Sequence, residues 1–322
     1  MTTELPRSSS SPPFIDGATI RRLTPMPALI SALRKIFVDA AEGPLRHHHE
    51  LPGNGTMLLM PAWRGDCSTG VKVVTVYRQA TPSVQSTYLL LDGRDGRPKA
   101  IMDGAMLTSR RTAAASALAA DMLARPDARC LLMMGAGTLA PHLVEAHCAV
   151  RPIDQVLIWG RNCAKTAATA AAISQSGAVT RAIADRLQAL ESAHIISTAT
   201  LSNTPLVIGQ RLKPGTHVDL VGAYKPDMCE ADPACFARAR VFVDTRAGVL
   251  AEAGDLLQAI AAGAMSASDI EADLAELCAG RHPGRGSDPD AVTVFKSVGT
   301  AIEDLAAAEL VYEAWHRETH GA

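Results

Sequence analysis

The fold of this 322-residue chain is decided by residues 130–140, which read CLLMMGAGTLA. The apolar run 130–134 predicts a buried strand, and a helix is expected to begin at Leu139. The turn between them, 135–140, has the form G-x-G-x-x-A: its first glycine permits a tight turn, its second admits a pyrophosphate, and its alanine allows close helix packing. A plain glycine turn is the alternative. The stretch predicts a dinucleotide site, with phosphate at the helix N-terminus, at Gly135, Gly137, Thr138 and Leu139.

The residues on either side of this turn alternate between short apolar runs and Ala-rich helical segments. This alternation is typical of a parallel sheet covered by helices on both faces. We expect helices over about 105–123, from 139, and over 164–174. Strands are expected at 130–134, 156–159, 178–180, 194–197, 217–221, 241–244 and 292–295. The predicted fold class is α/β, a Rossmann-type doubly wound parallel sheet of six or seven strands.

The first hundred residues have a different pattern. An amphipathic helix is predicted over 25–42, ended by Gly43-Pro44, and is followed by β-rich runs separated by Gly, Pro and Asp-Gly turns. The expected strands are 57–60, 71–77, 87–91 and 98–102. A last helix, 299–316, can return to this region. We therefore predict a smaller mixed α+β domain for substrate binding and dimerisation (14–110 and 298–322), a dinucleotide-binding domain (111–297) and a disordered Ser/Pro-rich N-terminus (1–13).

Composition excludes several classes of partner. Lys plus Arg number 31 against 33 Asp plus Glu, a net charge of −2, so nucleic acid and anionic membranes are not expected partners. No apolar run is long enough for a membrane span, and no signal peptide is evident. The seven cysteines form no C-x-x-C pair and are expected to be buried, reduced thiols of a cytoplasmic protein. No metal is expected, because consecutive histidines at 47–49 point to opposite sides of an extended segment and are more consistent with a cleft entrance.

The second strand of the dinucleotide domain bears on cofactor choice. An NAD-selective site usually has a carboxylate at the end of this strand to hold the ribose 2′-hydroxyl. Here the strand ends Ile158-Trp159-Gly160-Arg161-Asn162. The guanidinium of Arg161 suits a 2′-phosphate, which favours NADP(H), with NAD(H) as the alternative. A solvated arginine at a strand end is the other interpretation.

Several motifs in a fixed order give the chain a more specific resemblance. They include Arg46-His47-His48, Met60-Pro61-Ala62-Trp63, the segments 70–74 and 107–114, Ser197-Thr198-Ala199-Thr200, and Phe295-Lys296-Ser297-Val298-Gly299. With the glycine turn, these residues resemble the ornithine cyclodeaminase and mu-crystallin family from about Pro25 onward. The resemblance implies hydride transfer at an amino-acid α-carbon and a homodimer formed through the small domain.

The resemblance also implies roles for individual residues. Arg46, Lys72 and Arg111 match positions around the substrate carboxylate, a role that suits bidentate arginines and a lysine set between valines that needs a partner. Arg110 is expected to face solvent. Ser83 matches a cleft hydroxyl, and Thr198 and Ser297 match cofactor contacts. With Arg111 and Asn162, these three hydroxyl residues complete the expected cofactor contacts, although each hydroxyl could instead satisfy a loop or a helix cap.

One position departs from the cyclodeaminase pattern. Tyr224 stands where ornithine cyclodeaminases carry a catalytic aspartate, and a phenol with a pKa near 10 is a poor base at neutral pH. Variants of this kind resemble bacterial ketimine reductases. We therefore expect NAD(P)H-dependent reduction of Δ1-pyrroline-2-carboxylate, or its six-membered homologue, to L-proline or L-pipecolate, with Lys72 and Tyr224 as catalytic residues. The alternatives are an ornithine cyclodeaminase, an alanine- or opine-type dehydrogenase, and a non-catalytic NADPH-dependent ligand-binding protein.

Overall fold

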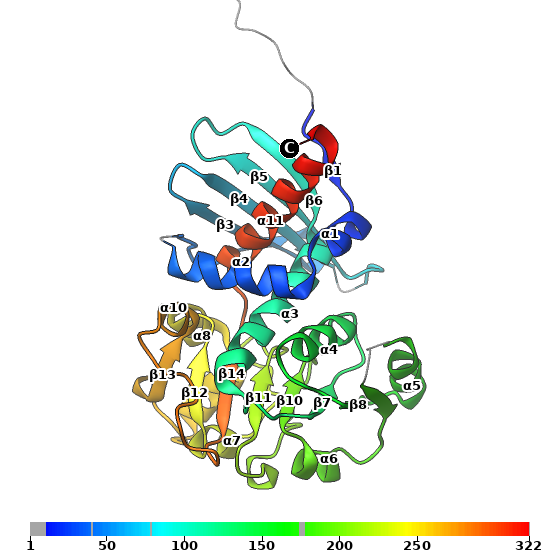
Figure 1. The fold of residues 1–322 in the computed structure, drawn as a ribbon, viewed down its shortest axis with the longest axis vertical. Coiled ribbons are helices and arrows are strands. Elements are labelled where there is room, and N and C mark those ends of the chain that lie inside the picture. Colours follow the sequence, from blue (N-terminus) through cyan, green and yellow to red (C-terminus); the bar gives the residue numbers. More distant parts are fainter. Residues whose placement is uncertain (1–10, 40, 78, 174–177, 322) are drawn as a thin grey trace, which may run out of the picture.

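The protein consists of two halves that meet along one long helix (Figure 1). The structure, a computed structural model, describes residues 11–321 except 40, 78 and 174–177. The upper half in Figure 1 is built on a six-stranded sheet and the lower half on an eight-stranded sheet. Helix α3 (Gly104–Leu123) joins the halves and packs against helices of both. Most of the predicted disordered N-terminus, residues 1–10, lies outside the described residues.

The lower sheet is wholly parallel, as the alternating pattern predicted. Its strand order is β13-β12-β14-β11-β10-β7-β8-β9. The strands are β7 (Cys130–Met134), β8 (Gln155–Trp159), β9 (Val179–Ala182), β10 (Ile195–Thr198), β11 (His217–Leu220), β12 (Arg240–Val243), β13 (Ile270–Asp273) and β14 (Thr293–Lys296). The prediction of six or seven strands was wrong, because the sheet has eight and the prediction omitted β13. The four residues of β13, IEAD, alternate apolar and polar at the edge of the sheet.

Helices connect these strands and cover the sheet. They are α4 (Leu139–Val150), α5 (Cys163–Ala172), α6 (Arg186–Ser192), α7 (Pro233–Ala237), α8 (Arg246–Glu252), α9 (Gly254–Ala261) and α10 (Leu274–Cys278). The chain runs from β7 through β8 to β9 in one direction across the sheet and then returns to β10 on the other side of β7. This reversal makes the carboxyl ends of β7 and β10 a topological switch point, where parallel sheets bind ligands.

The upper half is a mixed sheet whose strands contact helices α11 and α3, and α2 packs on these two helices. Strand β1 pairs in parallel with β6, and the other neighbours are antiparallel. Its elements are β1 (Phe14–Ile15), α1 (Gly17–Leu23), α2 (Met26–Val38), β2 (His47–Leu51), β3 (Gly55–Arg64), β4 (Ser68–Val76), β5 (Val84–Asp92), β6 (Pro98–Asp103) and α11 (Ala301–His320). Figure 1 shows α11, in red, lying across this sheet. The predicted return of the last helix is therefore confirmed.

Three sequence expectations differ from the structure. Helix α2 ends at Val38 instead of reaching 42, because the backbone turns extended at Asp39 and Glu42 then bridges to Trp63. The predicted helix 164–174 ends at Ala172, and its last residue lies outside the described part of the chain. The cysteines are all free thiols, but they are not all buried, because Cys67 and Cys163 are exposed. The predicted domain limits remain a proposal.

Candidate active site

The glycine turn has the geometry that a bound pyrophosphate requires. Gly135 adopts φ 120°, and a β-carbon there would lie 2.6 Å from the carbonyl oxygen of Ala199, so only glycine fits. A β-carbon on Gly137 would meet nothing within 4 Å, which leaves its backbone open to a ligand. Helix α4 begins after Thr138 without a side-chain cap, so its first N–H groups lack a side-chain acceptor. These residues fit a dinucleotide phosphate.

At the end of β8 the two candidate residues have different surroundings. Arg161 is exposed, whereas the Asn162 side chain caps α5 by accepting the Lys165 N–H at 2.9 Å. Thr198, at the end of β10, is fully buried, and its hydroxyl donates to Glu230 at 2.8 Å. Ser297 is buried directly after β14. Ser83 is exposed in the connection between β4 and β5. Their cofactor contacts remain predictions.

Glu230 organises the loops at this edge of the sheet, and sequence reasoning missed it. The carboxylate is fully buried and accepts N–H groups from Thr200 and Gly222, each at 2.6 Å. Burial raises its pKa, against the lowering effect of Lys296. Lys296 in turn forms an ion pair with Asp255 at 3.1 Å. The signal in the sequence was the glutamate that ends the Pro-x-Met-x-Glu segment after β11.

A second buried charge cluster lies in the upper half, and it contains two of the predicted substrate residues. Lys72 in β4 is 1% exposed, and its Nζ lies 2.9 and 2.7 Å from the two carboxylate oxygens of Asp304. Arg111 in α3 donates from Nε to Asp304 at 3.0 Å and from Nη1 to Glu303 at 2.5 Å. Lys72 therefore has a carboxylate partner within the protein, and its contact with the substrate remains a prediction. Neither acid was singled out from the sequence.

Burial and neighbouring charges shift the pKa values in this cluster. Burial lowers the pKa of Lys72 to about 8, and the positive charges of Arg111 and Arg46 add to this effect, against Asp304. For Arg111, burial disfavours the charge, but Asp304 and Glu303 outweigh it and raise the pKa. Arg111 thus keeps a positive charge, while Lys72 can lose its proton slightly above neutral pH.

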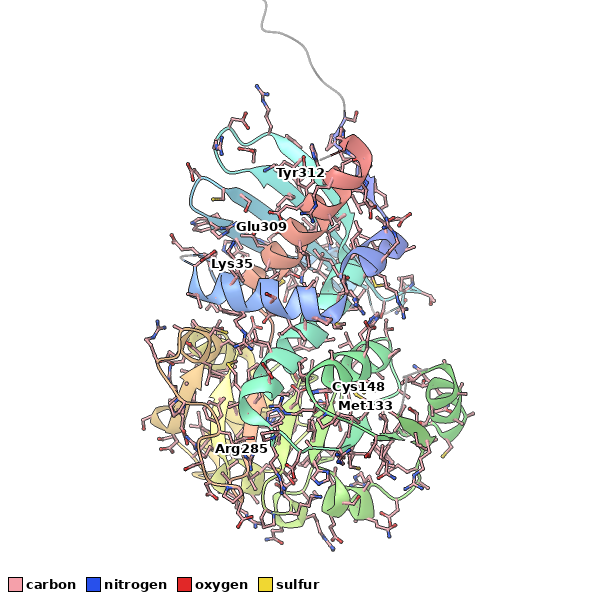
Figure 2. The ribbon with its side chains drawn as sticks, viewed as in Figure 1. Lys35, Met133, Cys148, Arg285, Glu309 and Tyr312 are labelled. Atoms are coloured by element: carbon pink, nitrogen blue, oxygen red, sulfur yellow. The ribbon has the colours of Figure 1, made fainter. Side chains whose placement is uncertain are left out.

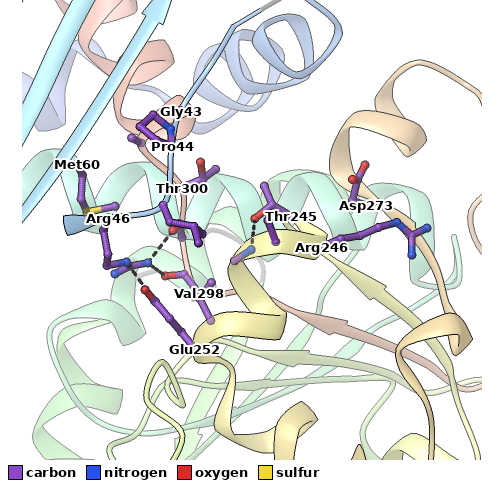
Figure 3. Close-up of a pocket in the computed structure, with 15 residues that line it drawn as sticks. Gly43, Pro44, Arg46, Met60, Thr245, Arg246, Glu252, Asp273, Val298 and Thr300 are labelled. Carbon is purple, nitrogen blue, oxygen red and sulfur yellow. Dashed lines mark hydrogen bonds and ion pairs between the residues drawn. The ribbon is translucent and has the colours of Figure 1, made fainter. Parts of the chain in front are cut away.

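Arg46 reaches the same region from a different side. Its Nη2 donates to the carbonyl oxygens of Val298 and Gly299, at 2.6 and 2.8 Å, and its Nε pairs with Glu252 at 3.1 Å (Figure 3). Gly299 also adjoins Arg111, because a β-carbon on it would lie 2.5 Å from Nη1 of that residue. The structure therefore brings Arg46 and Arg111 to the same glycine, with Lys72 linked to Arg111 through Asp304.

A pocket of about 390 Å³ lies between the two halves beside Arg46 (Figure 3). The upper half contributes residues 43–46 and Met60, and the lower half contributes residues that follow or end β12, β13 and β14. The pocket therefore lies at the carboxyl edge of the parallel sheet, where ligands bind in this architecture. Strand β14 is three places from β7, so the end of β14, the part of the pocket edge nearest the glycine turn, is about 14 Å from β7 across the sheet.

Tyr224 and the three histidines lie on different halves of the protein. Tyr224 is half-buried in the loop after β11, a strand between β7 and β14, and it packs against a hydrophobic cluster of the lower half that includes Leu220 and Val243. The histidines at 47–49 lie exposed on β2, where His48 Nε2 is 3.4 Å from Glu252. The described residues contain no group of three or more His, Cys, Asp or Glu side chains arranged to hold a metal ion.

The expectation for Arg110 was wrong. Its side chain is 1% exposed and donates to Glu145 at 2.7 Å and to the backbone of Thr24. Because α3 is packed on both sides, by helices α2 and α4, consecutive residues of this helix can both be buried. The two neighbouring arginines therefore serve different clusters, Arg110 near α4 and Arg111 at the start of α11.

The fold and the glycine turn define a nucleotide-binding α/β protein, and comparison with known proteins narrows this class. Residues 18–319 match the ornithine cyclodeaminase/mu-crystallin family, so the chain belongs to this family. It is 39% identical to the Δ1-pyrroline-2-carboxylate reductase of Paracoccus denitrificans over 313 residues, covering 95% of this chain and 98% of that protein.

Solved structures agree with this assignment. Thermococcus litoralis Δ1-pyrroline-2-carboxylate reductase, in complex with NADH and L-proline, matches with a TM-score of 0.89 and 33% identity, covering 96% of this chain and 98% of that one. An archaeal alanine dehydrogenase dimer with bound NAD matches with a TM-score of 0.88 and 26% identity, covering 97% and 98%. The Rossmann-type fold predicted from the sequence is confirmed.

Proposed function

We propose that this protein is an NAD(P)H-dependent imine reductase that converts a cyclic ketimine, Δ1-pyrroline-2-carboxylate or its six-membered homologue, to L-proline or L-pipecolate. The observation that carries the proposal is the meeting of Arg46 and Arg111 at Gly299, which lines the pocket, with Lys72 joined to Arg111 through Asp304. The similarity to reductases of Δ1-pyrroline-2-carboxylate supports the substrate class.

The reaction requires few groups from the protein. A bound nicotinamide would supply the hydride. Arg111 and Arg46 would clamp the substrate carboxylate, since a buried carboxylate needs cationic donors. Lys72, whose pKa is lowered to about 8, can hold or release a proton near neutral pH, and Tyr224 would order groups near the imine nitrogen. Orientation within a closed site then accounts for most of the rate.

The residues of the glycine turn would hold the cofactor. We favour NADP(H) because Arg161 follows β8 and no carboxylate occupies that strand end. The measurement is kcat/KM with NADPH and with NADH at saturating imine. A higher value with NADH would contradict the preference, and it would leave the reductase proposal intact.

Assembly and location are part of the same proposal. We expect a homodimer formed through the upper half, supported by the dimer found for the alanine dehydrogenase relative. A reducing, cytoplasmic location is supported by seven free cysteines. Within the described residues, no helix combines the length and apolar character needed to cross a membrane.

A paired assay separates this function from its main alternative. Purified protein is incubated with Δ1-pyrroline-2-carboxylate and NADPH, and with L-ornithine and NAD, while nicotinamide absorbance and ammonia are followed. We expect nicotinamide oxidation with the imine and no ammonia from ornithine. Ammonia release without net redox change would instead identify a cyclodeaminase. Tight NADPH binding with no turnover of any imine or amino acid would identify a ligand-binding protein.

A further inference from the structure

Two consecutive acids at the start of α11 hold both buried cations of the site. Asp304 is fully buried and accepts from Lys72 and Arg111, while Glu303 is 1% exposed and, among the described residues, accepts from Arg111 alone. When all four groups are ionised, their charges sum to zero. The Nη2 of Arg111 takes no part in the two contacts with the acids. The cluster is therefore balanced before any ligand is added.

The two acids respond differently to this environment. Burial opposes the ionisation of Asp304, but Arg111 and Lys72 outweigh it and hold its pKa below the usual range. Burial raises the pKa of Glu303 to about 7, and the Asp244 and Asp304 carboxylates add to this rise, against Arg111. The charged groups that face Glu303 are thus Arg111 from α3, Asp244 after β12, and Asp304 on its own helix.

Geometry also distinguishes Glu303 from its neighbour. Both oxygens of Asp304 lie against a cation, because Lys72 Nζ is 2.9 Å from one and 2.7 Å from the other. The Oε1 atom of Glu303 is buried and has neither a hydrogen-bond partner nor a cation beside it among the described residues. An unpartnered carboxylate oxygen in a buried site is costly when charged and much less so when protonated. The residues on its amino-terminal side, 298–301, line the pocket. Glu303 is therefore the member of the cluster that can most easily change its charge beside the ligand site.

We propose that Glu303 is a positioning residue that takes up a proton when a ligand carboxylate binds to Arg111. A ligand carboxylate adds one negative charge to a cluster that is otherwise neutral. Because a nearby like charge disfavours the ionised form of an acid, one carboxyl group must become neutral, and Asp304 is held charged by two cations. The protonated Glu303 weakens its hold on Nη1 of Arg111 and leaves that guanidinium to the ligand. The inference rests on the proposed carboxylate site.

The proposal predicts a linkage between ligand affinity and pH. At pH below the pKa of Glu303 the proton is already present, so affinity does not depend on pH. Above it, each unit of pH weakens binding by up to about tenfold, because a proton must be taken from solution. Lys72 would give a similar linkage only above its own, higher pKa of about 8.

The test uses the holoenzyme with NADP⁺ and pyrrole-2-carboxylate, a planar ring carboxylate whose nitrogen does not accept a proton. Calorimetry in buffers of different ionisation enthalpy at pH 7.5 measures the protons taken up. We expect an uptake of more than half a proton per site for the natural protein. Zero uptake, or no binding of the anion, would overturn the proposal without any variant being made.

A substitution then assigns the proton to Glu303. Glu303→Gln keeps the shape of the neutral acid, so uptake should vanish at pH 7.5, and the Kd at pH 8 should be about tenfold lower than in the natural protein. The matched control is Glu309→Gln on the same helix (Figure 2), whose carboxylate pairs with Arg64 outside the pocket; its uptake should be unchanged. Undiminished uptake in Glu303→Gln would contradict the assignment.

Kinetics distinguishes this role from a merely structural one. In Glu303→Gln the KM for the imine should lose its rise between pH 7 and 8, while kcat at low pH stays within about threefold. A uniform loss of kcat at every pH would contradict a positioning role. If the protein reduces no imine but shows anion-linked proton uptake that Glu303→Gln abolishes, the proposed function fails and this inference stands.

Discussion

Each half of the molecule buries a lysine paired with an aspartate, and the two aspartates differ in what else they bind. Lys296 in the lower half pairs with Asp255 and donates to the Leu220 carbonyl oxygen, while Asp255 accepts backbone N–H groups from Glu230 and Ala231. Lys72 in the upper half pairs with Asp304, whose carboxylate is shared with the side chain of Arg111. The lower cluster fixes the backbone of loops, whereas the upper cluster can be rearranged by a ligand.

The largest expected effect is on stability, in the lower cluster. Lys296→Met removes one partner of a fully buried ion pair and leaves the Asp255 charge uncompensated, which should cost about 3–5 kcal/mol of unfolding free energy. Urea unfolding measures it. The control is Lys35→Met, at an exposed position on α2 (Figure 2), where a change below about 0.5 kcal/mol is expected. If Lys296→Met lowered the unfolding free energy by less than about 1 kcal/mol, the lower cluster would not have the structural role that we assign to it.

The next effect is on activity, in the upper cluster. Arg111→Lys keeps the charge but loses the bidentate fork, so kcat/KM for the imine should fall at least a hundredfold, about 2.7 kcal/mol of transition-state stabilisation. Arg110→Lys is the matched control, since it changes the adjacent arginine, which binds Glu145. It should lower stability and leave kcat/KM within about threefold. Equal losses of activity in both variants would show that neither arginine is specific to the site.

The smallest expected effect concerns pH and the lower half. Burial lowers the pKa of His217 from 6.5 to about 3, so folding keeps it neutral while the unfolded chain protonates near 6.5. This contribution to stability is present above pH 6.5 and is lost as pH falls toward 3. At pH 5.5, one unit below 6.5, the stability lost through this residue is about 1.4 kcal/mol. Comparing urea unfolding at pH 7.5 and 5.5 in the natural protein and in His217→Asn measures it.

The result for His217→Asn decides whether this residue is the source of the pH effect. The variant should lose less stability than the natural protein over the same pH interval, even if it is less stable at both values. An identical pH dependence would show that other groups determine acid stability.

Much of the fold could be predicted because its signals are local. Strand β7 and the start of α4 fall at the predicted residues, since an apolar run and a glycine turn specify them within eleven positions. The short edge strand β13 was not predicted, because a run of four residues with alternating polarity cannot be distinguished from a loop by sequence alone. The end of α2 was misplaced for a related reason: the pairing of Glu42 with Trp63 is a tertiary contact.

The sequence by itself determined the dinucleotide turn, because the positive φ of Gly135 is a requirement of the local backbone that glycine meets. It also indicated that Lys72 needs a partner, because a charge within an apolar strand cannot stay buried alone. Only the tertiary structure decided which partner that is. Asp304 lies 232 positions from Lys72 in the chain, and no local pattern encodes a contact between β4, α3 and α11. The burial of Arg110 and the raised pKa of Glu303 were decided in the same way, because both depend on which elements pack around them.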